Sequence, residues 1–126
     1  MIKSTVCYLV HDEKWLMLLR NKKQHDLNHG KWIGVGGKLK TNETPYECMV
    51  REVIEETGYQ VQSALYCGII HFHYEHHEDE EIYVYQTSDY VGTLHECSEG
   101  TLAYIPKKDI LDLELWEGDR IFLEKM

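Results

Sequence analysis

Residues 37–59, GKLKTNETPYECMVREVIEETGY, carry the strongest structural signal in the chain. Thr44 is suited to cap the first turn of a helix, Pro45 takes the first helical position, and Glu47 completes a capping box. Gly58 is the residue type that usually follows the last turn of a helix. The stretch therefore predicts a helix that begins at Thr44 and ends at Gly58.

The two sides of this predicted helix differ in character. At 100° per residue, one side collects Met49, Val50, Val53, Ile54 and Thr57. The other side collects Glu52, Glu55 and Glu56, whose like charges repel one another at these spacings. These charges also lie beyond the N-terminal turn, where the helix dipole would stabilise them. Two interpretations follow: a solvated acidic face, or a set of carboxylates that binds Mg²⁺ or Mn²⁺ against phosphate groups.

Glycines upstream of the helix favour the metal-binding interpretation. Gly34, Gly36 and Gly37 directly precede the acidic helix and allow the backbone to approach a ligand closely. The chain contains the spacing Gly37-x5-Glu43-x7-Arg51-Glu52-Val53-x-Glu55-Glu56-x-Gly58-Tyr59. This spacing resembles the Nudix box, G-x5-E-x7-R-E-U-x-E-E-x-G-U, where U is bulky and apolar. Every fixed position is filled, and the tyrosine in the last apolar position is a mild departure.

The resemblance implies a fold, an activity and roles for individual residues. It implies an α/β/α sandwich and the hydrolysis, with Mg²⁺ or Mn²⁺, of a nucleoside diphosphate linked to another moiety. Glu52, Glu55 and Glu56 would bind the metal together with the carbonyl of Gly37, and Arg51 would orient these carboxylates. In some members the residue at Glu52 serves instead as the base. We therefore expect the catalytic centre on this helix.

Candidates outside the helix come from loops. The resemblance implies one more carboxylate after the central strands, for which we choose Glu99, with Glu96 as second choice and a surface glutamate as the alternative. Glu43 would be a secondary or structural position. Lys38 and Arg20 are expected to reach phosphate, with solvated or structural charges as the alternative.

The chain also resembles MutT-like oxidised-purine triphosphatases in two segments, 30–38 and 115–120. Trp116 would stack on a purine and Asp119 would bond to its polar edge, whereas the alternatives are a core tryptophan and a helix cap. Some relatives place an asparagine where Ile33 stands, which puts base recognition from that position in doubt. Backbone approach at Gly36 completes the expected substrate contacts.

Strand-forming segments surround the central helix. Strands are expected at residues 2–10, 14–20, 61–74, 81–91 and 101–105, with a glycine-broken strand or loop at 32–39. A second helix is expected at 113–126. This order predicts an α/β protein with a mixed sheet. His71 to Glu81 is interpreted as strand residues that run into a polar hairpin; an adventitious Zn²⁺ site, or a cleft wall with His71 and His73 on it, is the alternative.

Length and charge limit the remaining possibilities. The chain of 126 residues suits one Nudix domain over residues 1–126, and 13 basic against 22 acidic residues give a net charge of −9 that disfavours polymeric nucleic acid. It has no secretory pattern and no apolar run near the about 18 residues of a membrane span. The four cysteines show no C-x-x-C spacing. We expect a cytoplasmic protein without a membrane partner.

These observations converge on one expected function. It is the hydrolysis of a small nucleotide with Mg²⁺ or Mn²⁺. The best substrate candidate is 8-oxo-dGTP or a related oxidised purine triphosphate, and the products would be the monophosphate and pyrophosphate. Such a reaction removes damaged nucleotides from the nucleotide pool. A dNTP, ADP-ribose or a dinucleoside polyphosphate is the alternative substrate. A non-catalytic nucleotide-sensing Nudix module and a simple acidic metal-binding protein are the rival classes.

Overall fold

The described chain comprises residues 1–23 and 25–126 of a computed structural model. Its elements are, in chain order, β1 (Ile2–His11), β2 (Lys14–Leu19), β3 (Trp32–Ile33), β4 (Val35–Lys38), α1 (Pro45–Thr57), β5 (Tyr59–Phe72), β6 (Glu80–Gly92), β7 (Thr101–Pro106), the 3₁₀-helix η1 (Lys107–Asp112) and α2 (Glu117–Glu124). None of the helices in this part of the chain has the length and hydropathy to cross a lipid bilayer.

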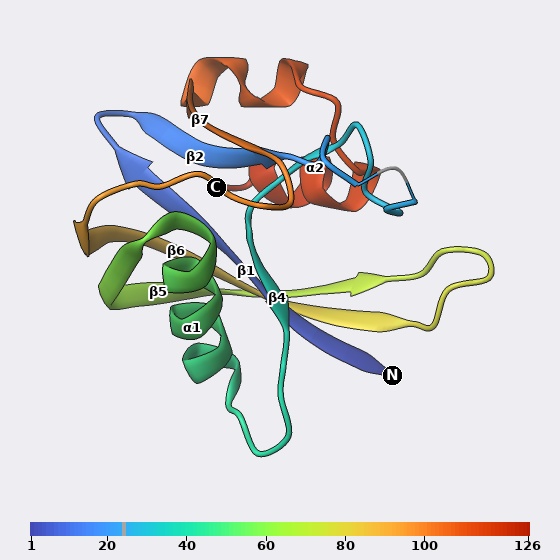
Figure 1. Cartoon of the computed structure of the whole chain (residues 1–126). Coiled ribbons are helices and arrows are strands. Elements are labelled where there is room, and N and C mark those ends of the chain that lie inside the picture. Colours follow the sequence, from blue (N-terminus) through green and yellow to red (C-terminus); the bar gives the residue numbers. More distant parts are fainter. Residues whose placement is uncertain (24) are drawn as a thin grey trace.

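The strands form one mixed sheet between the two α-helices (Figure 1). Its order is β3-β2-β1-β6-β5, while β4 also pairs with β1 and β7 with β2. The central strands β1 and β6 are parallel, and the other pairs are antiparallel. Successive side chains of β1 point to opposite faces, so Cys7 joins the core under α1 while Tyr8 joins the core under α2. The predicted α/β sandwich with a mixed sheet is confirmed.

The ends of α1 form as their residues predict. The Glu47 N–H donates to the Thr44 hydroxyl over 3.1 Å, and the Thr44 N–H donates back to the Glu47 carboxylate over 2.9 Å. Gly58 ends the helix in the left-handed conformation with φ of 86°, and its N–H donates to the Ile54 carbonyl. These caps fix where α1 starts and stops, and therefore where its carboxylates lie.

The buried face of α1 differs from the prediction at three residues, of which Cys48 is buried although it was not expected on the apolar side. Ile54 was expected on the apolar side, but it is 44% exposed. It lies five residues beyond Met49, which carries it about 140° around the helix. Glu56, seven residues beyond Met49, returns to within about 20° of it and is only 8% exposed. The helix therefore turns a carboxylate, and not Ile54, toward the sheet.

The second helix is shorter than predicted. The expected helix at 113–126 is wrong over its first four residues, because α2 begins only at Glu117. The Trp32 N–H donates to the Glu114 carbonyl over 2.8 Å, and this pairing holds the chain extended before α2. Residues 107–112 form η1, which the sequence pattern did not predict. Trp116 is therefore the N-cap residue of α2.

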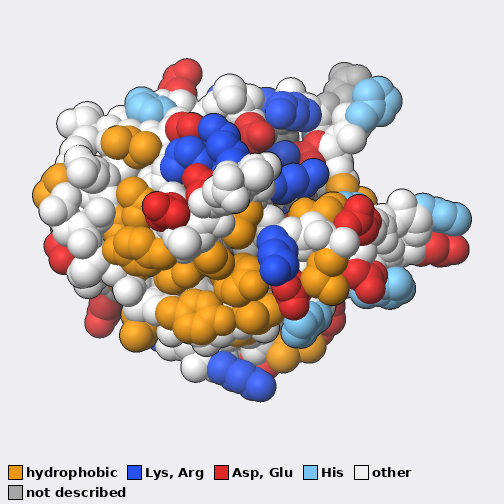
Figure 2. Space-filling view, turned by 90° about the horizontal axis from the view of Figure 1, so that it is seen from below, with side chains coloured by type: hydrophobic (Ala, Val, Ile, Leu, Met, Phe, Trp, Pro, Cys, Tyr) orange, Lys and Arg blue, Asp and Glu red, His pale blue; other side chains and the backbone are white. Residues whose placement is uncertain are grey.

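Hydrophobic side chains also gather on the surface (Figure 2). Leu65, Tyr66 and Ile69 on β5 are among the exposed large hydrophobic residues. The ring of Tyr66 packs 5.5 Å from that of Tyr85, and Tyr46 of α1 packs 5.9 Å from the same ring. These aromatic contacts extend the core beneath α1 to the edge of the sheet.

The cap at Gly58 provides a test of the fold. A Cβ added there would lie 2.4 Å from the Thr93 carbonyl oxygen, in a conformation that side chains disfavour. We expect Gly58→Ala to lower the free energy of unfolding by about 2 kcal/mol or more, measured by urea denaturation. The matched control is Gly118→Ala in α2, where the nearest atom is 3.8 Å away. Equal losses in both variants would contradict this account of α1.

Candidate active site

A cleft of about 530 Å³ is lined by residues from β1, β4, the middle of α1 and the first turn of α2. At one end its lining includes Gly36, Gly37, Arg51, Glu52 and Glu99, and at the other Asn28, Phe72, Glu80, Trp116 and Asp119. The first group includes three of the predicted catalytic residues, Arg51, Glu52 and Glu99, whereas Glu55 and Glu56 do not line the cleft. The second group includes Trp116 and Asp119, the predicted base-binding residues. The cleft therefore joins part of the predicted catalytic group to the predicted base-binding pair.

Two glycines allow the carboxylates of α1 to rest against the backbone of β4. The Gly36 N–H donates to Glu56 Oε2 over 2.9 Å. A Cβ on Gly36 would lie 1.9 Å from the Thr5 carbonyl oxygen, and one on Gly37 would lie 2.5 Å from the Glu52 carboxyl carbon. A Cβ on Gly36 would collide with the backbone of β1, and one on Gly37 would displace the Glu52 carboxylate, so close approach explains both glycines.

Arg51 organises the carboxylates around it. Its guanidinium donates to both oxygens of Glu43, over 2.7 and 2.9 Å, and to Glu52 over 2.7 Å. The hydrogen bonds from Arg51 lower the pKa of Glu43 to about 2. Glu55, 53% exposed, lies 3.3 Å from the same guanidinium but does not line the cleft. The geometry supports an orienting role for Arg51 and a structural role for Glu43.

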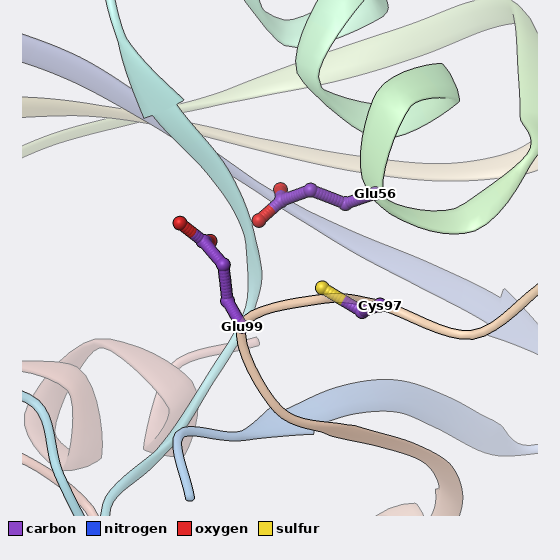
Figure 3. Close-up of side chains that lie close together, drawn as sticks. All are labelled: Glu56, Cys97 and Glu99. Atoms are coloured by element: carbon purple, nitrogen blue, oxygen red, sulfur yellow. The ribbon is translucent and has the colours of Figure 1, made fainter. Parts of the chain in front are cut away.

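Glu56 and Glu99 face each other across the site (Figure 3). Burial first, and then the hydrogen bond and the negative charge of Glu99, raise the pKa of Glu56. Burial also opposes ionisation of Glu99, but the hydrogen bond from Glu56 and the nearby cations hold its pKa below the usual value. Burial raises the pKa of Glu52 as well, against the effect of Arg51. Glu56 therefore holds its proton more strongly than Glu99 does.

Glu99, and not Glu96, reaches this cluster. Its carboxylate lies 3.8 Å from the guanidinium of Arg20 and 3.4 Å from the ammonium of Lys23. Arg20 also pairs with Asp26 over 2.7 Å, so it contacts acidic groups of the cleft wall and holds Glu99 in place. Glu96 is exposed and does not line the cleft. Lys38 is an exposed cation on the cleft lining, as expected for a phosphate contact.

Trp116 stands in an aromatic box at the far end of the cleft. Its ring lies 5.3 Å from Phe72 and 5.5 Å from Tyr74, with the Lys31 ammonium 5.2 Å from its centroid. Its indole N–H donates to the Asn28 side-chain oxygen over 2.6 Å. These contacts hold the ring at the cleft wall, where one purine base can stack on it.

Asp119 lies within the first turn of α2, and the N-cap position belongs to Trp116. The capping alternative for Asp119 is therefore wrong. Its side chain lines the cleft, and burial raises its pKa to about 6. Ile33 also lines the cleft and offers no polar side-chain atom. Asp119 is therefore one of the polar side chains that line this end of the cleft.

Several cleft residues were not found from the sequence. Glu80 accepts a hydrogen bond from the Ser4 hydroxyl over 2.5 Å and lies 3.4 Å from His77 Nε2. His77 lines the cleft, whereas the cleft-wall alternative for His71 and His73 is wrong because both are exposed outside it. Ser4 and Glu80 are far apart in sequence, and the β1–β6 pairing that sets Ser4 beside Ile82 brings them together.

The residues from His71 to Glu81 form the predicted polar hairpin. β5 ends at Phe72, β6 begins at Glu80, and His73 pairs with Asp79 over 2.5 Å. Across residues 1–23 and 25–126, the one place where three His, Cys, Asp or Glu ligand atoms come together is at Glu56, Cys97 and Glu99. The metal-binding alternative for the hairpin gains no support.

Comparison with known proteins identifies the family. The NUDIX domain matches the chain over residues 1–126. The chain belongs to the Nudix family. It is 27% identical over 110 residues to an oxidized purine nucleoside triphosphate hydrolase of Danio rerio, which covers 86% of this chain and 70% of that protein. It is 28% identical over 129 residues to the Nudix hydrolase YvcI of Bacillus subtilis, covering 98% and 78%.

Solved structures agree with this membership. A MutT protein from Methanosarcina mazei superposes with a TM-score of 0.86 at 25% identity, covering 98% of this chain and 91% of that one. A MutT protein from Bacillus halodurans gives a TM-score of 0.85 at 24% identity, covering 98% and 80%. The protein is thus a Nudix pyrophosphohydrolase with a MutT-like fold. Nudix hydrolases generally use divalent metals and act on small nucleotides.

The pKa of Asp119 provides a test of its burial. Because this pKa is raised to about 6, the folded state binds the proton more tightly than the unfolded chain, and ionisation destabilises the fold as the pH rises through this range. We expect the stability of Asp119→Asn, relative to the unchanged protein, to rise by about 1 to 3 kcal/mol between about pH 4 and pH 7. Asp112→Asn, at an exposed position, is the control. A pH-independent difference for Asp119→Asn in denaturant unfolding would contradict the burial of its charge.

Proposed function

We propose that this Nudix hydrolase converts an oxidised purine nucleoside triphosphate, such as 8-oxo-dGTP, into the monophosphate and pyrophosphate with Mg²⁺. The observation that carries the proposal is the single cleft that joins the carboxylate cluster of α1 to the aromatic box of Trp116. The activity named for the Danio rerio relative agrees with this substrate class.

The donor set of the cluster fits a hard divalent cation. Glu52, Glu56 and Glu99 and the carbonyl of Gly37 would hold it, and all four offer oxygen, which Mg²⁺ and Mn²⁺ prefer. The absence of a Cβ at Gly37 allows the Glu52 carboxylate to approach this backbone segment. When bound, the cation lowers the pKa of a water molecule and neutralises charge on the phosphoryl oxygens.

The chain's own residues orient this chemistry. Arg51 fixes Glu52 and Glu43 through hydrogen bonds, and Arg20 and Lys23 hold Glu99. A carboxylate of the cluster accepts the proton of the attacking water. Lys38, exposed at the cleft, supplies positive charge to the phosphates. Little covalent chemistry remains for the protein, because positioning and electrostatics dominate phosphoryl transfer.

The other end of the cleft selects the base. Trp116 supplies a stacking surface whose orientation Asn28 fixes, and Asp119 bonds to the polar edge of the purine. Oxidation at position 8 of guanine changes the donor and acceptor pattern of its edge, including N7. A buried polar group discriminates strongly between such patterns, because the wrong base leaves it unpaired.

Removing one carboxylate tests the metal-dependent chemistry. We expect Glu56→Gln to lower kcat by at least about a hundredfold, because it removes a charged oxygen ligand of the metal while keeping the shape of the side chain. The measurement is a panel of nucleotides with Mg²⁺ (8-oxo-dGTP, dGTP, dATP, ADP-ribose, a dinucleoside polyphosphate) with identification of the products. Glu124→Gln, exposed on α2, is the control. Retained turnover in Glu56→Gln would contradict the metal assignment, and preference for another nucleotide would contradict the substrate.

Base recognition is tested separately at Asp119. We expect Asp119→Ala to raise KM for 8-oxo-dGTP about tenfold more than KM for dGTP, since the lost hydrogen bonds serve the oxidised base. Steady-state kinetics with both nucleotides measures this ratio. An equal rise for both substrates would remove Asp119 from base discrimination, while leaving the catalytic cluster unaffected.

A further inference from the structure

A thiol lies beside the facing carboxyls of the active site. Cys97, in the loop before β7, is 3% exposed, and its Sγ lies within 4.8 Å of a carboxylate oxygen of both Glu56 and Glu99 (Figure 3). We infer that Cys97 is a third ligand, which lets this site bind a thiophilic divalent cation such as Zn²⁺ through one sulfur and two carboxylates. The site shares Glu56 and Glu99 with the proposed magnesium centre and in that respect rests on the proposed function.

The distances among the three side chains suit a common cation. In a tetrahedral zinc site, a Zn–S bond of about 2.3 Å and a Zn–O bond of about 2.1 Å place the two ligand atoms about 3.6 Å apart. The three ligand atoms lie within 4.8 Å of one another, so side-chain rotations that shorten the longest separation by about 1 Å would let them meet on one cation. Glu56 and Glu99 already point toward each other, and the sulfur lies beside them (Figure 3).

The backbone around Cys97 is held in place by contacts of its own. Cys97 forms a β-bridge with Gly100, and the Lys22 ammonium donates to its carbonyl over 2.8 Å. A Cβ on Gly100 would lie 2.0 Å from the Leu19 carbonyl oxygen, so this turn packs directly against the end of β2. The same short turn carries both Cys97 and Glu99, and it presents them to Glu56 together.

Sulfur changes which cation the site prefers. Mg²⁺ binds oxygen and water, so it would use the carboxylates and leave the thiol aside. Zn²⁺ and Co²⁺ accept thiolate and carboxylate together, and three protein ligands leave a fourth position for water or phosphate. Zn²⁺ is therefore expected to compete with Mg²⁺ for Glu56 and Glu99 in this protein, and Cys97 is the residue that gives Zn²⁺ its advantage.

Cobalt provides a spectroscopic probe that needs no nucleotide. We expect Co²⁺ added to the metal-free protein to produce the near-ultraviolet charge-transfer band of a thiolate–cobalt bond. The intensity of the band should correspond to one such bond per chain. Cys97→Ser should remove this band and weaken Zn²⁺ binding, measured by cobalt displacement, by about tenfold or more. Cys67→Ser is the matched control, because Cys67 lies on β5 and is not part of the group formed by Glu56, Cys97 and Glu99, so this variant should keep the band.

A second measurement uses the unchanged chain, so it stands even if the Cys97 variant fails to fold. X-ray absorption at the zinc edge should show one sulfur at about 2.3 Å, with oxygen completing the shell. A shell of oxygen and nitrogen alone, or a cobalt band that persists in Cys97→Ser, would overturn the inference. A missing sulfur with intact Mg²⁺-dependent hydrolysis would overturn only the role of Cys97, whereas a zinc–sulfur bond without hydrolysis would overturn only the proposed function.

Discussion

The hydrogen bond from the Gly36 N–H to the buried carboxyl of Glu56 joins the helix of this protein to its sheet. It satisfies a polar group that would otherwise be costly to bury, and it fixes the rotation of α1 about its own axis. That rotation places Glu52 against Gly37 and turns Ile54 into solvent. A carboxyl group of the active site, that of Glu56, therefore holds α1 in its position against β4.

Part of the negative charge of the chain is concentrated around this contact. Five of the 22 acidic residues, Glu43, Glu47, Glu52, Glu55 and Glu56, lie in α1 and its entry. A net charge of −9 repels phosphate at long range, but a divalent cation bound among these carboxylates would supply positive charge where phosphate must approach. Arg51 arranges this cluster without neutralising it, because one guanidinium faces several carboxylates.

Local features could be predicted from the sequence, and contacts between distant segments could not. The capping box of α1 and the Gly58 stop depend on neighbours within four residues, so both were predicted correctly. The burial of Glu56 was also encoded by helical period, but a glutamate was not expected on the apolar side. The sequence pattern did not indicate that Asn28 belongs to the site, because its hydrogen-bond partner Trp116 is 88 positions away. The turn that sets Cys97 beside Glu99 depends on packing against the end of β2, which no local pattern reveals.

The location of the bound cation tests the account most directly. Crystals soaked with Mn²⁺, with data collected at the manganese absorption edge, would show its position by anomalous scattering. The account predicts a peak among the carboxylates of Glu52, Glu56 and Glu99, beside the carbonyl of Gly37. A peak only at the His73–Asp79 hairpin, or no peak at the carboxylates of Glu52, Glu56 and Glu99, would contradict it.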